Sequence, residues 1–80
     1  MDAKPVASLQ KNVREELRVD LTEYRGHRLL GLRIWADKSD GSGKVATPKG
    51  VTVKVAMLSA IRAALADAER QARDAGWLND

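Results

Sequence analysis

The stretch Leu17–Ala36, LRVDLTEYRGHRLLGLRIWA, carries the clearest structural pattern of this 80-residue chain. Apolar and polar residues alternate from Leu17 to Leu21, and the same period of two resumes at Leu30. Such alternation is typical of strands with one buried face and one solvated face. Between the two runs, Arg25-Gly26 supplies a tight turn, because glycine readily adopts positive φ. The stretch therefore predicts a long antiparallel hairpin.

Downstream of the hairpin, the sequence predicts two more strands and one helix. Residues 37–44 (DKSDGSGK) are rich in turn-forming types and indicate a connector. KVAT at 44–47 predicts a short third strand, PKG a turn, and VTVKV at 51–55 a fourth strand with many β-branched residues. Beyond that, apolar residues recur with helical period up to Gly76, which favours a helix end. The expected fold class is α+β, a four-stranded antiparallel sheet followed by one C-terminal helix (ββββα).

The chain length predicts a single small domain that gains stability as a homodimer. Residues 1–13 carry Pro5, lack periodicity and indicate a flexible N-terminal arm, which leaves 14–80 as the domain. Eighty residues bury a thin core, and without cysteine no disulfide can support it. Alanines on the helix would let a second helix approach closely, although alanine is also favoured for helix propensity alone. Trp77 and Leu78 are expected to pack back on the last helical turn.

The Gly- and Lys-rich stretch Ser39–Gly50 superficially suggests a phosphate-binding loop. A P-loop requires a glycine at position 38, Ser or Thr after Lys44 and a helix starting there. The chain instead has Lys38, then Val45, and Pro48 interrupts any helix. This stretch does not predict a nucleotide site.

Catalytic and metal sites find no support in the sequence. His27 is the single histidine and belongs to no recognisable nucleophile motif, and without cysteine a structural zinc site is excluded. Glu15 and Glu16 are neighbours on a strand, so they point to opposite faces and cannot act as an acid/base pair. We therefore predict a protein that is not an enzyme and that needs no metal or small-molecule cofactor.

Positive charge is concentrated in the middle of the chain. Residues 25–54 contain seven basic and two acidic residues, whereas the whole chain has a net charge of +3. Such a concentration favours an anionic partner, although a solvated basic face without a partner is also common. No signal peptide or membrane span is recognisable, so we expect a cytoplasmic location, associated with the nucleoid if the source is prokaryotic.

Alternation sets Trp35 and Arg33 on the face opposite Leu30, Leu32 and Ile34. Together with Arg18 and Tyr24 they would form a mixed aromatic and basic surface. Unpaired bases stack on aromatic rings while cations follow the phosphates, so this surface favours single-stranded nucleic acid. The alternative is that Trp35 is buried in a dimer interface or under a loop.

The order of these segments resembles the transcriptional coactivator family called positive cofactor four, whose members bind single-stranded DNA. The resemblance covers about Leu17 to Ala72 and is carried by YRGH at 24–27, LRIW at 32–35 and Lys49-Gly50 before an alternating strand. It implies a homodimer with two β-ribbons that form channels for single strands of DNA, while the sequence itself leaves RNA open as a partner. It further implies stacking by Tyr24 and Trp35 and phosphate contacts from Arg25, His27, Arg33, Lys44 and Lys49.

Three departures from the family pattern suggest weaker binding and leave a second interpretation open. Ala36 replaces an aromatic residue, Pro48 replaces a basic one, and His27 replaces a frequent lysine. The predicted function is single-stranded DNA binding in transcription regulation, replication or repair. The alternative is a protein-interaction module that docks an acidic protein through the same ribbon.

Overall fold

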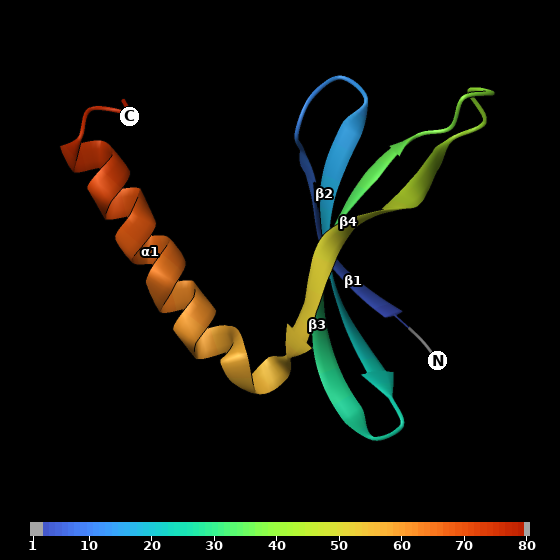
Figure 1. Ribbon diagram of the computed structural model, residues 1–80, viewed down its shortest axis with the longest axis horizontal. Helices are drawn as coiled ribbons and strands as arrows, with labels where there is room; N and C mark the ends of the chain where they lie inside the picture. The colour runs from blue at the N-terminus through green and yellow to red at the C-terminus, as the bar shows by residue number, and fades with distance from the viewer. Residues whose placement is uncertain (1–2, 80) are drawn as a thin grey trace.

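The computed structural model describes residues 3–79 and consists of one sheet and one helix (Figure 1). The four strands are β1 (Ala3–Gln10), β2 (Glu15–Tyr24), β3 (His27–Asp37) and β4 (Lys44–Lys54). All neighbouring strands are antiparallel, and their order in the sheet follows the sequence. A short 3₁₀ turn, η1 (Val55–Met57), leads into the helix α1 (Leu58–Asp74). The predicted fold class, a four-stranded antiparallel sheet with one C-terminal helix, is confirmed.

The β2–β3 hairpin has the register that the alternation predicts. Leu17 pairs with Ile34, and Tyr24 pairs with His27, so two residues make the turn. Arg25 and Gly26 both have positive φ, at 51° and 80°. This combination defines the turn type that matches the twist of a two-residue hairpin, and it explains why glycine is needed at position 26.

Two of the four strands differ from their predicted extents. The prediction of a flexible arm is wrong for Ala3–Gln10, because these residues form β1 and pair with β2. The predicted third and fourth strands are one continuous strand, β4, so the turn predicted at PKG is wrong as well. In both cases a register shift interrupts the alternation, at Pro5/Ala7 in β1 and opposite Arg33/Trp35 in β4.

The irregularity in β4 is a bulge that inserts Thr47–Lys49 opposite Ile34. Arg33 pairs with Gly50 and Trp35 pairs with Ala46, so three residues of β4 face one residue of β3. The Thr47 hydroxyl donates to the Ile34 carbonyl at 2.8 Å and accepts from the Lys49 amide at 3.2 Å. A side chain at Gly50 would place its Cβ 2.5 Å from the Leu32 carbonyl oxygen, so only glycine fits where β4 rejoins β3.

The helix ends in a C-terminal motif that depends on Gly76. The Trp77 amide donates to the Ala72 carbonyl at 2.8 Å and the Gly76 amide to the Arg73 carbonyl at 3.0 Å, while Gly76 has φ +80°. These two bonds define the Schellman arrangement at a helix end. The expectation that Trp77 packs on its own helix is wrong, since its side chain is 81% exposed.

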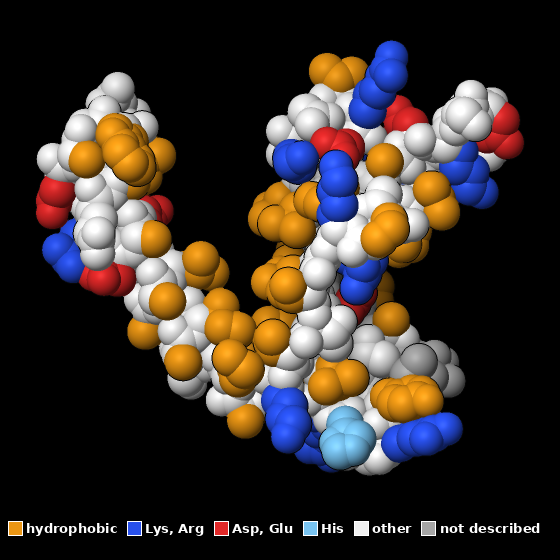
Figure 2. Space-filling model, in the orientation of Figure 1, with side chains coloured by type: hydrophobic (Ala, Val, Ile, Leu, Met, Phe, Trp, Pro, Cys, Tyr) orange, Lys and Arg blue, Asp and Glu red, His pale blue; other side chains and the backbone are white. Residues whose placement is uncertain are grey.

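The apolar core of the single chain is incomplete. Among the described residues, Leu30 alone is a buried apolar residue, at 5% exposure, whereas Leu65 in α1 is 64% exposed. The helix leaves the sheet at η1 and points away from it, so that sheet and helix form a V (Figure 1). Hydrophobic side chains line both inner sides of this V (Figure 2). An isolated chain therefore leaves much of its apolar surface in contact with water.

Candidate nucleic-acid interface

The sheet separates an apolar face from a face of mixed aromatic and charged residues. Residues paired across neighbouring strands project to the same face. The pairs Leu17–Ile34, Val19–Leu32 and Leu21–Leu30 build the apolar face. The pairs Glu16–Trp35, Arg18–Arg33 and Tyr24–His27 build the other one, which we call the ribbon face. The side of the sheet predicted for Arg33 and Trp35 thus agrees with the register.

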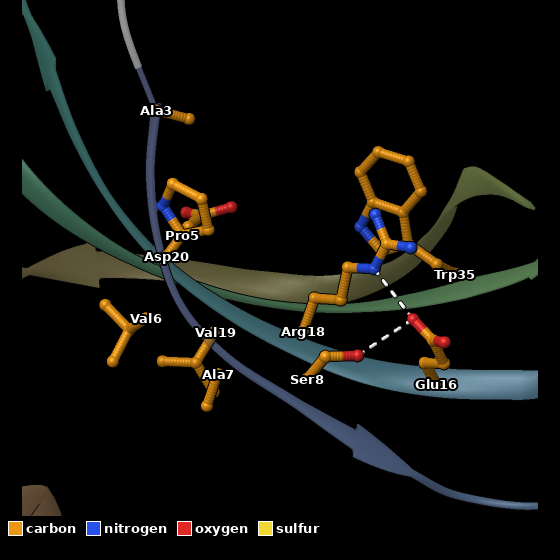
Figure 3. A pocket seen from close by; sticks show the side chains of 10 residues that line it. All are labelled: Ala3, Pro5, Val6, Ala7, Ser8, Glu16, Arg18, Val19, Asp20 and Trp35. Atoms are coloured by element: carbon orange, nitrogen blue, oxygen red, sulfur yellow. Dashed lines mark hydrogen bonds and ion pairs between the residues drawn. The ribbon is translucent and has the colours of Figure 1, made fainter.

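Trp35 lies at one end of a chain of contacts that runs across three strands. The Arg18 guanidinium carbon lies 4.1 Å from the centroid of the Trp35 ring, a cation–π distance. Arg18 Nε donates to Glu16 Oε1 at 2.8 Å, and Ser8 Oγ donates to the same oxygen at 2.9 Å (Figure 3). The hydrogen bond from Arg18, and then that from Ser8, lower the pKa of Glu16. Glu16 is therefore ionised at neutral pH and holds Arg18 over the indole.

A second aromatic and basic group lies at the β2–β3 turn. Tyr24 is 45% exposed, and the Arg25 guanidinium carbon lies 5.1 Å from its ring centroid. His27 pairs with Tyr24 and is exposed beside it. His27, which pairs with Tyr24, precedes Trp35 by eight residues of β3. At the rise of an antiparallel strand, this spacing anchors the Tyr24 and Trp35 rings about 27 Å apart along the hairpin. Both rings lie on the ribbon face, far enough apart to contact different nucleotides.

The β4 bulge ends at Lys49, the residue before Gly50, which pairs with Arg33. Arg33 Nη1 donates to the Thr47 carbonyl at 3.0 Å, so part of this guanidinium stabilises the bulge. Lys49 is exposed at the same bulge, and within residues 3–79 its side chain makes no hydrogen bond and no ion pair. Lys49 is therefore free to contact a phosphate, whereas Arg33 offers its remaining donors only.

Lys44 is placed differently from the other predicted contacts. Its ammonium lies 2.6 Å from Asp37 Oδ1 and 3.3 Å from the Arg14 carbonyl oxygen, and it is mostly buried by them. These contacts tie the ends of β3 and β4 to the segment before β2. A phosphate would have to compete with Asp37 for this lysine, so Lys44 is the weakest of the predicted phosphate contacts.

The sequence reasoning missed the side chains that surround Trp35. Ser8 escaped because β1 was not recognised. Arg18 was assigned to the right surface, but its stacking on Trp35 depends on a diagonal relation across the β2–β3 register. Ala36, by contrast, pairs with Glu15 and Val45 on the apolar side. An aromatic residue at position 36 would not have joined the ribbon face.

Other types of site are not apparent in the part of the chain that the structure describes. Residues 3–79 contain no group of three or more His, Cys, Asp or Glu side chains arranged to hold a metal ion. No helix among them has the length and apolarity required to cross a membrane.

Comparison with solved structures identifies similar chains in bacteria and in a phage. A PC4 (positive cofactor four) homologue from Burkholderia pseudomallei superposes with a TM-score of 0.76 at 28% sequence identity, covering 86% of this chain and 92% of that one. A second crystal form of the same homologue gives 0.75 at 26% identity, with coverages of 85% and 98%. The bacteriophage T5 homologue of the eukaryotic transcription coactivator PC4, implicated in recombination-dependent DNA replication, gives 0.61 at 17% identity, with coverages of 96% and 85%. The last likeness concerns the fold alone. No protein-family model and no curated protein sequence matches the chain.

Proposed function

We propose, from the premise that the chain is a PC4-like protein of the bacterial and phage type, that it binds single-stranded DNA as a homodimer. The binding surface is the ribbon face, with Tyr24 and Trp35 as stacking residues. The phosphate contacts are Arg25, His27, Arg33 and Lys49, with a lesser contribution from Lys44. The protein would act in transcription regulation, replication or repair.

The observation that carries this proposal is the separation of the two sheet faces. Trp35 and Tyr24 share the ribbon face with Arg18, Arg33 and His27, while the pairs Leu17–Ile34, Val19–Leu32 and Leu21–Leu30 lie on the other side. Bases in a duplex are stacked on one another, whereas unpaired bases offer their rings to aromatic side chains. A surface that combines separated aromatic rings with cations fits an unpaired strand better than a duplex.

The open V between sheet and helix supports dimerisation. Apolar side chains line both arms, and Leu65 and Trp77 are largely exposed in the single chain. A second copy related by a two-fold axis would insert its helix into this space and cover the same residues of both chains. The two ribbon faces would remain outside the interface and available to DNA.

The alternative function considered from the sequence was the docking of an acidic protein. Its main support was the missing aromatic residue at Ala36, but Ala36 lies on the apolar side of the sheet. The absence of an aromatic residue there removes nothing from the ribbon face. Nothing else in the structure favours a protein partner for the ribbon face over single-stranded DNA.

A titration with labelled oligo-dT, beside a duplex of the same length and an RNA oligo-U, tests the function. We expect tighter binding to the unpaired strand than to the duplex, since stacking contributes roughly 1 to 3 kcal/mol per base. Affinity for the unpaired strand should fall with salt, with a log–log slope of about −0.7 per phosphate contacted. Equal affinity for single strand and duplex would indicate generic electrostatics and contradict the proposal.

A further inference from the structure

A hollow of about 490 Å³ lies on the ribbon face between β1 and Trp35 (Figure 3). Trp35 and Arg18 stand at one side of it, and Pro5 and Asp20 at the other. Its lining combines apolar side chains from β1 and β2 with three charged groups. The hollow is therefore next to the proposed stacking platform, yet it also contains groups that phosphate binding does not explain.

Asp20 is the charged group that lacks a partner. It is half-buried, and within residues 3–79 its carboxylate takes part in no hydrogen bond and no ion pair. Glu16, four residues away on the same strand, is in contrast bound by both Arg18 and Ser8. Two carboxylate oxygens of Asp20 are thus free to accept hydrogen bonds from a ligand in the hollow.

The backbone around Asp20 keeps this carboxylate over the middle of the sheet. Its strand neighbours are Pro5 on one side and Gly31 on the other. Asp20 Oδ1 lies 2.5 Å from the position that a Cβ on residue 31 would take, so the carboxylate occupies space that exists only because residue 31 is glycine. A free carboxylate here repels phosphates, and its place on a DNA-binding face calls for a ligand that donates hydrogen bonds.

An unpaired guanine is the base whose edge best matches a carboxylate. Single strands expose their Watson–Crick edges to side chains. Guanine presents two adjacent donors there, the ring N1–H and the N2 amino group, which can bind both oxygens as a guanidinium does. Adenine and cytosine present one donor beside an acceptor nitrogen, and thymine presents one donor between two carbonyls. Each of these three would set a lone pair against the second carboxylate oxygen.

We propose that Asp20 makes the hollow a guanine-selective subsite, in which the base lies beside the Arg18–Trp35 pair and donates N1–H and N2–H to Asp20. This inference rests on the proposed single-stranded DNA binding. It adds a base preference to a surface that otherwise contacts rings and phosphates without regard to sequence.

The test compares T-rich oligonucleotides that contain isolated guanines with the same oligonucleotides carrying hypoxanthine at those positions. Hypoxanthine differs from guanine by the missing N2 amino group, so stacking and phosphate contacts are preserved. By fluorescence anisotropy, the unmodified protein should bind the guanine strand roughly tenfold more tightly, as a hydrogen bond to a charged acceptor predicts. In Asp20→Asn the preference should disappear, because the amide offers one acceptor and one donor.

Asp40→Asn is the matched control, because it makes the same change of charge in the exposed loop, where Asp40 accepts hydrogen bonds from the side chain and the backbone amide of Ser42. Both variants should bind all strands somewhat more tightly, but Asp40→Asn should keep the guanine preference. Equal binding of the two strands by the unmodified protein, or a preference that survives in Asp20→Asn, would overturn the inference while leaving single-stranded DNA binding intact. Failure to bind any strand would overturn the proposed function and the subsite with it.

Discussion

At the scale of single residues, Trp35 is the side chain on which the proposed function most depends. Its indole is half-buried beneath Arg18, yet it contributes nothing to the apolar face on which Leu30 is buried. Arginine stacked on an indole forms a polar cover that a base can share or replace, because guanidinium planes and aromatic rings both stack on bases. Trp35 can therefore serve DNA without being required for folding.

Replacement of Trp35 by alanine should weaken binding to oligo-dT by about 1 to 3 kcal/mol with little change in the melting temperature. Intrinsic fluorescence gives an independent measurement. With Trp77→Phe, the remaining Trp35 should be strongly quenched by the oligonucleotide, whereas with Trp35→Phe the remaining Trp77 should respond little. If Trp77 carried the quenching, or if Trp35→Ala unfolded the chain, Trp35 would be an interface or core residue and the assignment of the ribbon face would be wrong.

At the scale of elements, alternation predicted the hairpin well and failed where a bulge breaks it. In β2 and β3 no irregularity interrupts the pairing, so the period of two correctly separated Leu32 from Arg33. In β1 the shift between Pro5 and Ala7 changes which residues share a face, and the alternation disappears from the sequence. The bulge at Thr47–Lys49 divided β4 in the same way. Residue periodicity could not reveal a strand whose phase changes midway.

The candidate site was predictable to the same extent. Tyr24, Arg33 and Trp35 could be assigned to one face because their hairpin is regular. The pairing of Lys44 with Asp37, and the contacts from Ser8 and Glu16 toward Arg18, require the neighbouring strands to be placed first. The register between strands determines which side chains contact each other across them. The sequence of one strand does not reveal this register.

The β4 bulge offers a prediction at this scale, through the Thr47 hydroxyl. Thr47→Val keeps the shape of the side chain but removes two hydrogen bonds, one to the Ile34 carbonyl and one from the Lys49 amide. We expect a loss of roughly 1 to 2 kcal/mol in the free energy of unfolding, measured by denaturant titration, together with weaker binding of oligo-dT as Lys49 loses its fixed position.

Thr52→Val is the control for the bulge, because it makes the same chemical change at an exposed position of β4. The Thr52 hydroxyl makes no hydrogen bond within the described residues, so its removal should leave stability and affinity nearly unchanged. Similar losses in the two variants would mean that the hydroxyl of Thr47 does not hold the bulge.

At the scale of the whole molecule, the sequence indicated a thin core, and the structure locates the missing part. The helix does not lie on its own sheet but diverges from it, and the apolar side chains on the two arms of the V face each other across open space (Figures 1 and 2). Small domains commonly complete such cores by oligomerisation. The exposed Trp77 and Leu78, which were expected to pack on their own helix, are then available to a partner copy.

Sedimentation at micromolar concentration should accordingly give twice the 8.8 kDa mass of the chain. Leu65 lies on the apolar side of α1 and is 64% exposed in the single chain, so Leu65→Glu would bring a charge into the proposed interface. This variant should sediment as a monomer or lose its helical circular dichroism, since folding and association of such a small chain are coupled. Ala63→Glu is the matched control, because helical geometry sets residue 63 on the opposite side of α1, where a charge meets solvent. It should remain a folded dimer. A folded monomer in the unmodified protein, or equal behaviour of the two glutamate variants, would mean that the apolar V is closed by some means other than a second copy of the chain.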